Sequence, residues 1–216
     1  MVPQADDAAV SEGEASQAQS ARMTPMTDEA EAGSAQRARM MRLFVAVFPP
    51  ADAIADLTAA LSTIDIRVPA AERLHITLAF LGDQPDAGPA IAALDAGMAG
   101  EAGGKPLGEL AIQGGGRFGS ILWAGIAGDI AGLTKLTRLV RRSLRAHRVQ
   151  PDDKRFRPHL TLARRLSHEA VGVGVGALHD YEGPAWPVRE IVLVHSVLGS
   201  QPVYHPVKTW PLPRRS

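Results

Sequence analysis

Two short segments of nearly the same sequence, LHITLAFL at 74–81 and PHLTLARR at 158–165, constrain the fold of this chain more than any other feature. Both are largely apolar, with the alternation typical of β-strands, in which successive side chains point to opposite faces. In each copy a histidine and a threonine, two residues apart, fall on one face, and branched apolar residues fall on the other. The repeat therefore predicts two equivalent strands that each present an imidazole and a hydroxyl to one side.

From residue 41 onward the chain alternates between strand-like and helix-like segments. We expect strands at 41–48, 74–81, 107–112, 120–126, 158–163, 188–198 and 203–210. We expect helices at 52–61, 89–98 and 129–147, the last capped by Asp129, and a short irregular or helical piece after residue 165. Each motif lies downstream of a strand that leads into a helix, so the two halves repeat. This order predicts an α+β fold of two pseudo-twofold lobes, with antiparallel sheets lining a central groove and helices outside.

The first 40 residues differ from the rest in composition. They hold seven acidic and three basic residues and no aromatic one, and nothing in them is periodic enough to offset the entropy of ordering. We expect residues 1–40 to be a disordered extension and residues 41–216 to form a single two-lobed domain. The extension lacks the basic start and apolar core of a secretory leader, and no apolar stretch approaches the roughly 18 residues of a membrane helix. We therefore expect a cytoplasmic protein without a membrane contact.

The absence of cysteine removes several classes of chemistry at once. No disulfide framework, thiolate nucleophile or thiolate metal site can form. Two histidines that face each other across a groove can act as proton donor and acceptor near neutral pH, and threonine hydroxyls can hold phosphate oxygens between them. Neither motif contains an acidic residue, and two imidazoles leave a metal short of ligands, so we expect no metal and no cofactor. The sequence thus predicts catalytic His75 and His159, with Thr77 and Thr161 as phosphate ligands.

The pair of H-x-T-x motifs, HITL at 75–78 and HLTL at 159–162, resembles that of the 2H phosphoesterase superfamily. The surrounding RLFVAV, LWAG and RPHLTLAR segments are similar to its RNA 2′,3′-cyclic phosphodiesterase branch, also called the LigT-like or 2′-5′ RNA ligase family. The likeness covers residues 41 to about 212. It implies metal-independent hydrolysis of a terminal 2′,3′-cyclic phosphate on RNA to a 2′-phosphomonoester. It also implies weak 2′-5′ ligation, the chemical reverse of ring opening.

The resemblance further implies roles for individual residues. His159 activates the water and His75 protonates the departing 3′ oxygen, while Thr77 and Thr161 bind the phosphate. Arg164, two residues past the second motif, matches a family arginine that contacts phosphate or base. Two aromatic residues near the groove are expected to stack on the terminal base, with core packing as the alternative: Phe44 and Tyr204.

Basic residues are concentrated ahead of the second motif. Residues 135–165 carry 11 of the 23 Lys and Arg but only two acidic residues. Arg155 and Arg157 are placed to steer phosphate, although a solvated helix face is the simpler interpretation. We expect RNA 3′ ends or small cyclic nucleotides as partners, and nothing in the sequence requires more than a monomer. The alternatives are a phosphodiesterase for a small cyclic nucleotide or ADP-ribose cyclic phosphate, and an RNA- or phosphate-binding module without turnover.

Some other motifs carry no expected chemistry. The run GGGRFG at 114–119 matches G-x-G-x-x-G in form, but a strand follows it where a nucleotide site needs a helix, so we expect a hairpin loop. The remaining glycines and histidines of interest lack matched partners or ligand spacing. We expect these to be structural or exposed: Gly172, Gly174, Gly176, His168, His179, His195 and His205.

Overall fold

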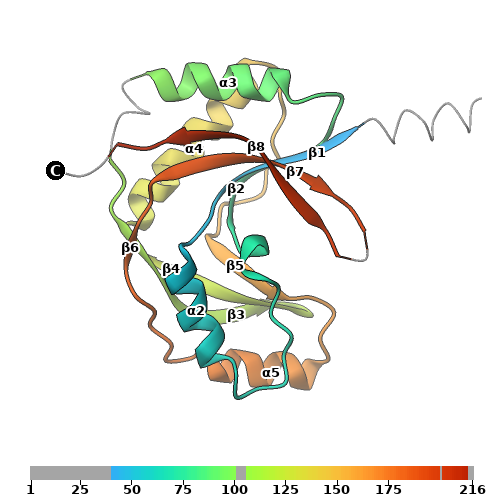
Figure 1. The fold of residues 1–216 in the computed structure, drawn as a ribbon, viewed down its shortest axis with the longest axis vertical. Coiled ribbons are helices and arrows are strands. Elements are labelled where there is room, and N and C mark those ends of the chain that lie inside the picture. Colours follow the sequence, from blue (N-terminus) through green and yellow to red (C-terminus); the bar gives the residue numbers. More distant parts are fainter. Residues whose placement is uncertain (1–39, 101–105, 200, 214–216) are drawn as a thin grey trace, which may run out of the picture. The chain divides into compact units, whose positions relative to one another are not determined.

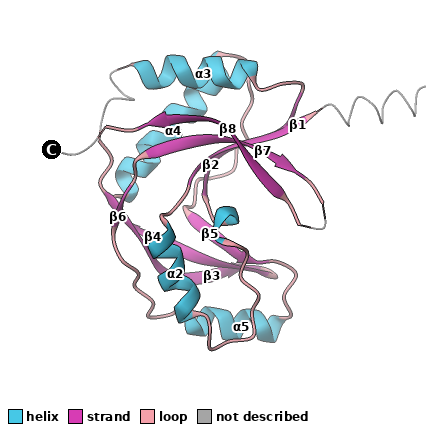
Figure 2. Cartoon of the chain, viewed as in Figure 1, coloured by secondary structure: helices cyan, strands magenta, loops and turns pink. Residues whose placement is uncertain are grey.

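The computed structural model describes residues 40–100, 106–199 and 201–213. The expected disordered extension therefore lies, apart from residue 40, outside the described residues. Eight antiparallel strands form one sheet in the order β6-β3-β4-β5-β2-β1-β7-β8 (Figures 1 and 2). The strands are β1 (Met41–Val47), β2 (Ile76–Gln84), β3 (Glu109–Phe118), β4 (Ile121–Gly128), β5 (His159–Ala163), β6 (Trp186–Pro187), β7 (Glu190–Val197) and β8 (Val203–Pro211).

The helices follow the predicted order closely. They are α2 (Ala51–Ala60), the 3-10 turn η1 (Ala71–Arg73), α3 (Gly88–Ala99), α4 (Ile130–Ala146) and α5 (His168–Ala177). Asp129 caps α4 as predicted, because its carboxylate accepts a hydrogen bond of 2.8 Å from the Gly132 amide. The piece after residue 165 is helical and is capped in the same way by the Ser167 hydroxyl.

The sheet consists of two halves that meet at β2 and β5, so the two expected sheets are halves of a single one. The third strand of each repeat crosses to the opposite half: β3 pairs with β4, and β7 pairs with β1. Helices are exchanged between the two halves as well. The helices α3 and α4 pack against each other, α4 packs on β2, and α3 packs on β8 (Figure 1). The helix α2 packs on β3, and α5 packs on β3 and β4. The α+β pseudo-twofold fold is confirmed, with its two repeats interlocked by exchanged strands and helices.

The glycine-rich run at 114–119 is not the hairpin loop that we expected. Residues 114–118 continue β3, and the turn to β4 consists of Gly119 and Ser120 alone. At Gly115 and Gly116 neighbouring side chains occupy the space of a Cβ atom, whereas Gly114 and Gly119 have the positive φ that favours glycine. The indole of Trp123 packs on Gly116, and Leu178 packs on Gly115. The run therefore provides close packing within a strand.

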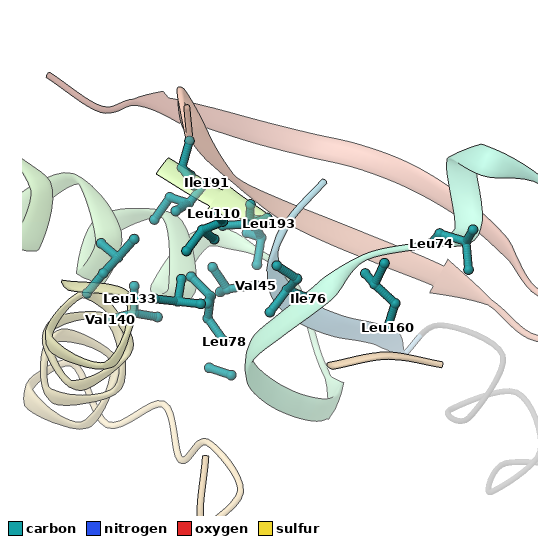
Figure 3. Close-up of a cluster of buried hydrophobic side chains, with 14 of the residues drawn as sticks. Val45, Leu74, Ile76, Leu78, Leu110, Leu133, Val140, Leu160, Ile191 and Leu193 are labelled. Carbon is teal, nitrogen blue, oxygen red and sulfur yellow. The ribbon is translucent and has the colours of Figure 1, made fainter. Parts of the chain in front are cut away.

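The main hydrophobic core lies between the sheet and its helices. Figure 3 shows Val45, Ile76, Leu78 and Leu160 from the central strands in one cluster with side chains from α4. A second, smaller apolar cluster lies on the other face of the sheet, at β1 and β7. Its buried members are Phe44, Ala46, Val192 and Val194, with Phe48, Phe80 and Tyr204 packed against them. The alternation of β1 therefore divides its side chains between two apolar environments.

Candidate active site

The two H-x-T-x motifs meet at the centre of the sheet. Ile76 of β2 pairs with Leu160 of β5 in antiparallel register, and both side chains are fully buried in the main core. Continuing this register by one residue on either side sets His75 opposite Thr161 and Thr77 opposite His159. All four of these side chains lie on the face opposite the main core and are half-buried. The pseudo-twofold axis thus passes between the motifs and brings the two imidazoles and two hydroxyls together.

Both imidazoles are fixed by the same backbone hydrogen bond. Nδ1 of His75 lies 2.9 Å from the carbonyl oxygen of Arg73, and Nδ1 of His159 lies 2.7 Å from that of Arg157. A carbonyl oxygen can only accept, so Nδ1 of each ring carries a proton and donates it. Nε2 of each neutral ring then has a free lone pair. Each histidine is consequently oriented to exchange a proton through Nε2.

His75 is enclosed by aromatic rings. Its imidazole stacks on Phe44 at a centroid distance of 4.6 Å, meets the edge of Tyr204 at 5.2 Å and lies 5.7 Å from Phe48. Burial among these rings is the largest cause that lowers the His75 pKa from 6.5 to about 4. The positive charges of His159 and Arg164 lower it further, against the hydrogen bond to Arg73, which raises it. His75 is therefore neutral at pH 7 in the free protein.

The surroundings of His159 are different in kind. Phe118 and Trp123 stack on each other at 5.2 Å, and both approach the imidazole edge-on, at 5.2 and 6.3 Å. Gly125 is the strand partner of His159, so the position of β4 directly opposite the histidine carries no side chain. Trp123 keeps its buried indole N–H without a hydrogen-bond partner among the described residues. The two histidines thus have unequal surroundings: His75 contacts three aromatic rings, and His159 contacts two.

The remaining predicted residues surround the two histidines. Within the described part of the chain, the hydroxyls of Thr77 and Thr161 make no hydrogen bond in the protein, so both can bind a ligand. Arg164 is exposed, and its charge acts on His75. Phe44 is only 4% exposed and already stacks on His75, whereas Tyr204 keeps some surface open.

Three aromatic residues that contact the site histidines were not predicted from the sequence: Phe48, Phe118 and Trp123. Trp123 lies between the buried Leu122 and Ala124 on β4, and this alternation would have shown which face it occupies, but not its distance from His159. Phe118 gives no such signal, because its neighbours on β3 are not buried. The four histidines that we expected to be structural or exposed make no contact with the site. His195 and His205 face each other across β7 and β8, and His179 is exposed.

Two further features bear on cofactors and membranes. No group of three or more His, Asp or Glu side chains suited to a metal ion occurs among the residues that the structure describes. Of the helices in residues 40–100, 106–199 and 201–213, none combines the length and apolarity needed to cross a bilayer.

Comparison with known proteins points to one family. The family model of the 2′-5′ RNA ligase superfamily matches residues 47–199. An RNA 2′,3′-cyclic phosphodiesterase of Geobacillus stearothermophilus is 34% identical over 148 residues, which are 65% of this chain and 46% of that relative. The chain thus spans about half the length of this curated relative.

Solved structures agree in fold. LigT of Escherichia coli complexed with phosphate has a TM-score of 0.61 at 23% identity, over 82% of this chain and 99% of its own. A protein of Thermus thermophilus gives the same TM-score at 27% identity, over 82% of this chain and all of its own. The resemblance that the two H-x-T-x motifs indicated is confirmed: the chain belongs to the 2′-5′ RNA ligase superfamily of 2H phosphoesterases and has the LigT-like fold.

Proposed function

We propose that the protein hydrolyses a 2′,3′-cyclic phosphate at the end of an RNA to a 2′-phosphomonoester. The observation that carries this proposal is the pair of imidazoles, each fixed at Nδ1 by a backbone carbonyl and related by the pseudo-twofold axis. A cyclic phosphodiester needs one proton removed from the attacking water and one given to the leaving oxygen, which two such groups supply. The name of the Geobacillus stearothermophilus relative supports the same substrate.

The reaction follows from the two Nε2 atoms. Nε2 of His159 accepts a proton from water, whose oxygen forms a bond to phosphorus. The bond between phosphorus and the 3′ oxygen breaks, and that oxygen takes the proton from Nε2 of His75. The product carries a 2′-phosphomonoester and a 3′ hydroxyl, and the two histidines end with exchanged protonation. No step requires a metal, and the described residues supply no third ligand beside the two imidazoles.

The role of His75 as acid requires the substrate itself. In the free protein the pKa of His75 is about 4, so at pH 7 the ring is neutral. A cyclic phosphate brings a negative charge into the poorly solvated pocket, and a nearby opposite charge favours the protonated imidazole. Substrate binding therefore raises the pKa of His75, so that the ring takes up the proton that it later donates. An imidazolium in an apolar pocket is also a strong acid, which favours transfer to the departing oxygen.

The substrate would be held by groups that the protein leaves free. Thr77 and Thr161 lie opposite the two histidines and offer hydroxyl donors to the phosphate oxygens. Arg164 supplies a positive charge near His75. For the terminal base, Tyr204 has open surface to stack on, whereas Phe44 is occupied by His75.

Product analysis with single variants tests the proposal. Purified protein is given an oligonucleotide ending in a 2′,3′-cyclic phosphate, and the position of the product phosphate is read by NMR. We expect the 2′-phosphomonoester, with His75→Ala and His159→Ala each slower by about 10²- to 10⁴-fold, the usual size of acid–base contributions. His179→Ala is the control, because this exposed histidine lies outside the site. A 3′-phosphomonoester would contradict the proposed leaving group.

The two roles can be separated with a second substrate. A phosphodiester with a 4-nitrophenolate leaving group needs no proton on departure. We expect His75→Ala to recover most of its activity on this ester and His159→Ala to remain impaired, because only the water-activating base is still required. The reverse pattern would exchange the roles of the two histidines.

A further inference from the structure

The residue that orients His75 is itself held by a distant part of the chain. Arg73 is the last residue of η1, and its carbonyl oxygen accepts the Nδ1 proton of His75 at 2.9 Å. Its guanidinium donates a hydrogen bond of 2.7 Å to Oε1 of Gln201, which lies between β7 and β8. A side chain 128 residues away in the sequence thus anchors the residue whose carbonyl fixes the imidazole.

The same part of the chain also reaches the imidazole directly. Tyr204 of β8 meets the His75 ring edge-on at a centroid distance of 5.2 Å, and β8 packs against η1. The segment that joins β7 to β8 and the start of β8 therefore act on His75 at two points. Tyr204 contacts the ring, and Gln201 supports the residue that accepts its proton.

The second motif has no equivalent support. Arg157 stands two residues before His159, as Arg73 stands two residues before His75, and its carbonyl accepts from Nδ1 in the same way. Within the described part of the chain, however, the guanidinium of Arg157 makes no hydrogen bond and no ion pair. The tether is thus specific to the half of the site that contains the proposed acid.

The charge of Arg73 does not explain its place beside the site. The positive charges that lower the pKa of His75 are those of His159 and Arg164, and the Arg73 guanidinium is not among them. The side chain of Arg73 is directed to Gln201, and its carbonyl is directed to the imidazole. Any effect of Arg73 on His75 therefore passes through the backbone.

We propose that Arg73 and Gln201 are positioning residues for His75, because their hydrogen bond keeps the Arg73 carbonyl in place and so keeps Nε2 of the ring directed at the leaving oxygen. This inference rests on the proposed function, in which His75 is the acid. A general acid works only within hydrogen-bond reach of the oxygen that it protonates, so a small rotation of the ring slows this step. An acceptor that a separate segment holds in place limits that rotation.

The first test is a double-mutant cycle with two substrates. Gln201→Ala removes the acceptor, Arg73→Met removes the donor but keeps an unbranched side chain, and the double variant removes both. Gln201→Glu keeps an acceptor oxygen at the same reach, and Gln150→Ala, at another exposed glutamine, is the control. For each protein, kcat and KM are measured on RNA ending in a 2′,3′-cyclic phosphate and on the 4-nitrophenyl phosphodiester, whose leaving group needs no acid.

On the cyclic phosphate we expect Gln201→Ala and Arg73→Met each to lower kcat about three- to tenfold, the factor that one hydrogen bond supplies, with KM unchanged. The double variant should lose no more than either single variant, because all three lack the same hydrogen bond. Gln201→Glu and Gln150→Ala should keep the wild-type kcat, and every variant should match the wild type on the nitrophenyl ester. Losses that multiply, a raised KM or an equal loss on both substrates would overturn the inference.

The Nδ1 proton of His75 gives a second readout that does not depend on turnover. In protein with isotope-labelled histidine, NMR measures how fast this proton exchanges with water. We expect slow exchange in the wild type and in Gln201→Glu, and faster exchange in Gln201→Ala. Equal exchange rates in all three proteins would overturn the inference. A wild type that shows this difference but hydrolyses no cyclic phosphate would support the tether and contradict only the proposed function.

Discussion

Protonation of His75 should cost folding stability, because its aromatic enclosure is built for the neutral ring. The pKa falls from 6.5 in an unfolded chain to about 4 in the folded protein. Between these values the unfolded state binds one proton more, so stability is complete above pH 6.5 and is lost as the pH falls toward 4. A difference of about 2.5 units corresponds to about 3 kcal/mol. This is an upper limit, since the half-buried ring keeps some contact with water.

The assay is urea unfolding of the wild type and of His75→Gln at pH 7 and at pH 4. Gln cannot titrate, so subtracting its pH dependence removes the contribution of the carboxylates and of the other histidines. We expect the wild type to lose up to about 3 kcal/mol more than the variant between the two pH values. Equal losses, or a larger loss in His75→Gln, would refute the argument that burial among Phe44, Phe48 and Tyr204 disfavours the charged ring.

Other predictions concern the ligand, the glycine strand and the core. Adding a 2′-nucleotide should raise the pKa of His75 from about 4, as measured by an NMR titration of its ring protons. An unchanged pKa would contradict the argument that the bound phosphate favours the protonated ring. Gly116→Ala should lower the melting temperature because the new methyl group collides with Trp123, whereas Gly172→Ala, in open space, should not. Leu160→Ala should cost about 2–5 kcal/mol in urea unfolding, as for other fully buried leucines, and a loss below about 1 kcal/mol would place this strand outside the core.

The candidate site was predictable from sequence where it depends on local alternation. The period of two in each motif places His75 with Thr77 and His159 with Thr161 on one face, and the repetition indicates that the two faces belong to one site. Most of the order of strands and helices was predictable for the same reason, although β6 and η1 were not predicted and α5 was expected only as a short irregular or helical piece. The long helix α4 and the central strands show a clear apolar pattern, whereas the two-residue strand β6 is too short to show one.

What depends on pairing between distant segments was not predictable. The exchange of β3 and β7 between the halves is a choice among pairings that the strand sequences do not distinguish. The glycine run looked like a loop because Leu178 and Trp123 fill the space of a side chain at Gly115 and Gly116, and only the tertiary fold brings these two residues there. Likewise, Phe48 reaches His75 through the register of β1 with β2.

The most direct test of the account is the rate of cyclic phosphate opening with all metal removed. An RNA ending in a 2′,3′-cyclic phosphate is incubated in EDTA with the wild type or with His75→Ala/His159→Ala. The account predicts full activity of the wild type in EDTA and a loss of about 10²-fold or more in the double variant. An EDTA-sensitive wild type, or a double variant that still turns over at the wild-type rate, would contradict the claim that these two imidazoles carry the reaction.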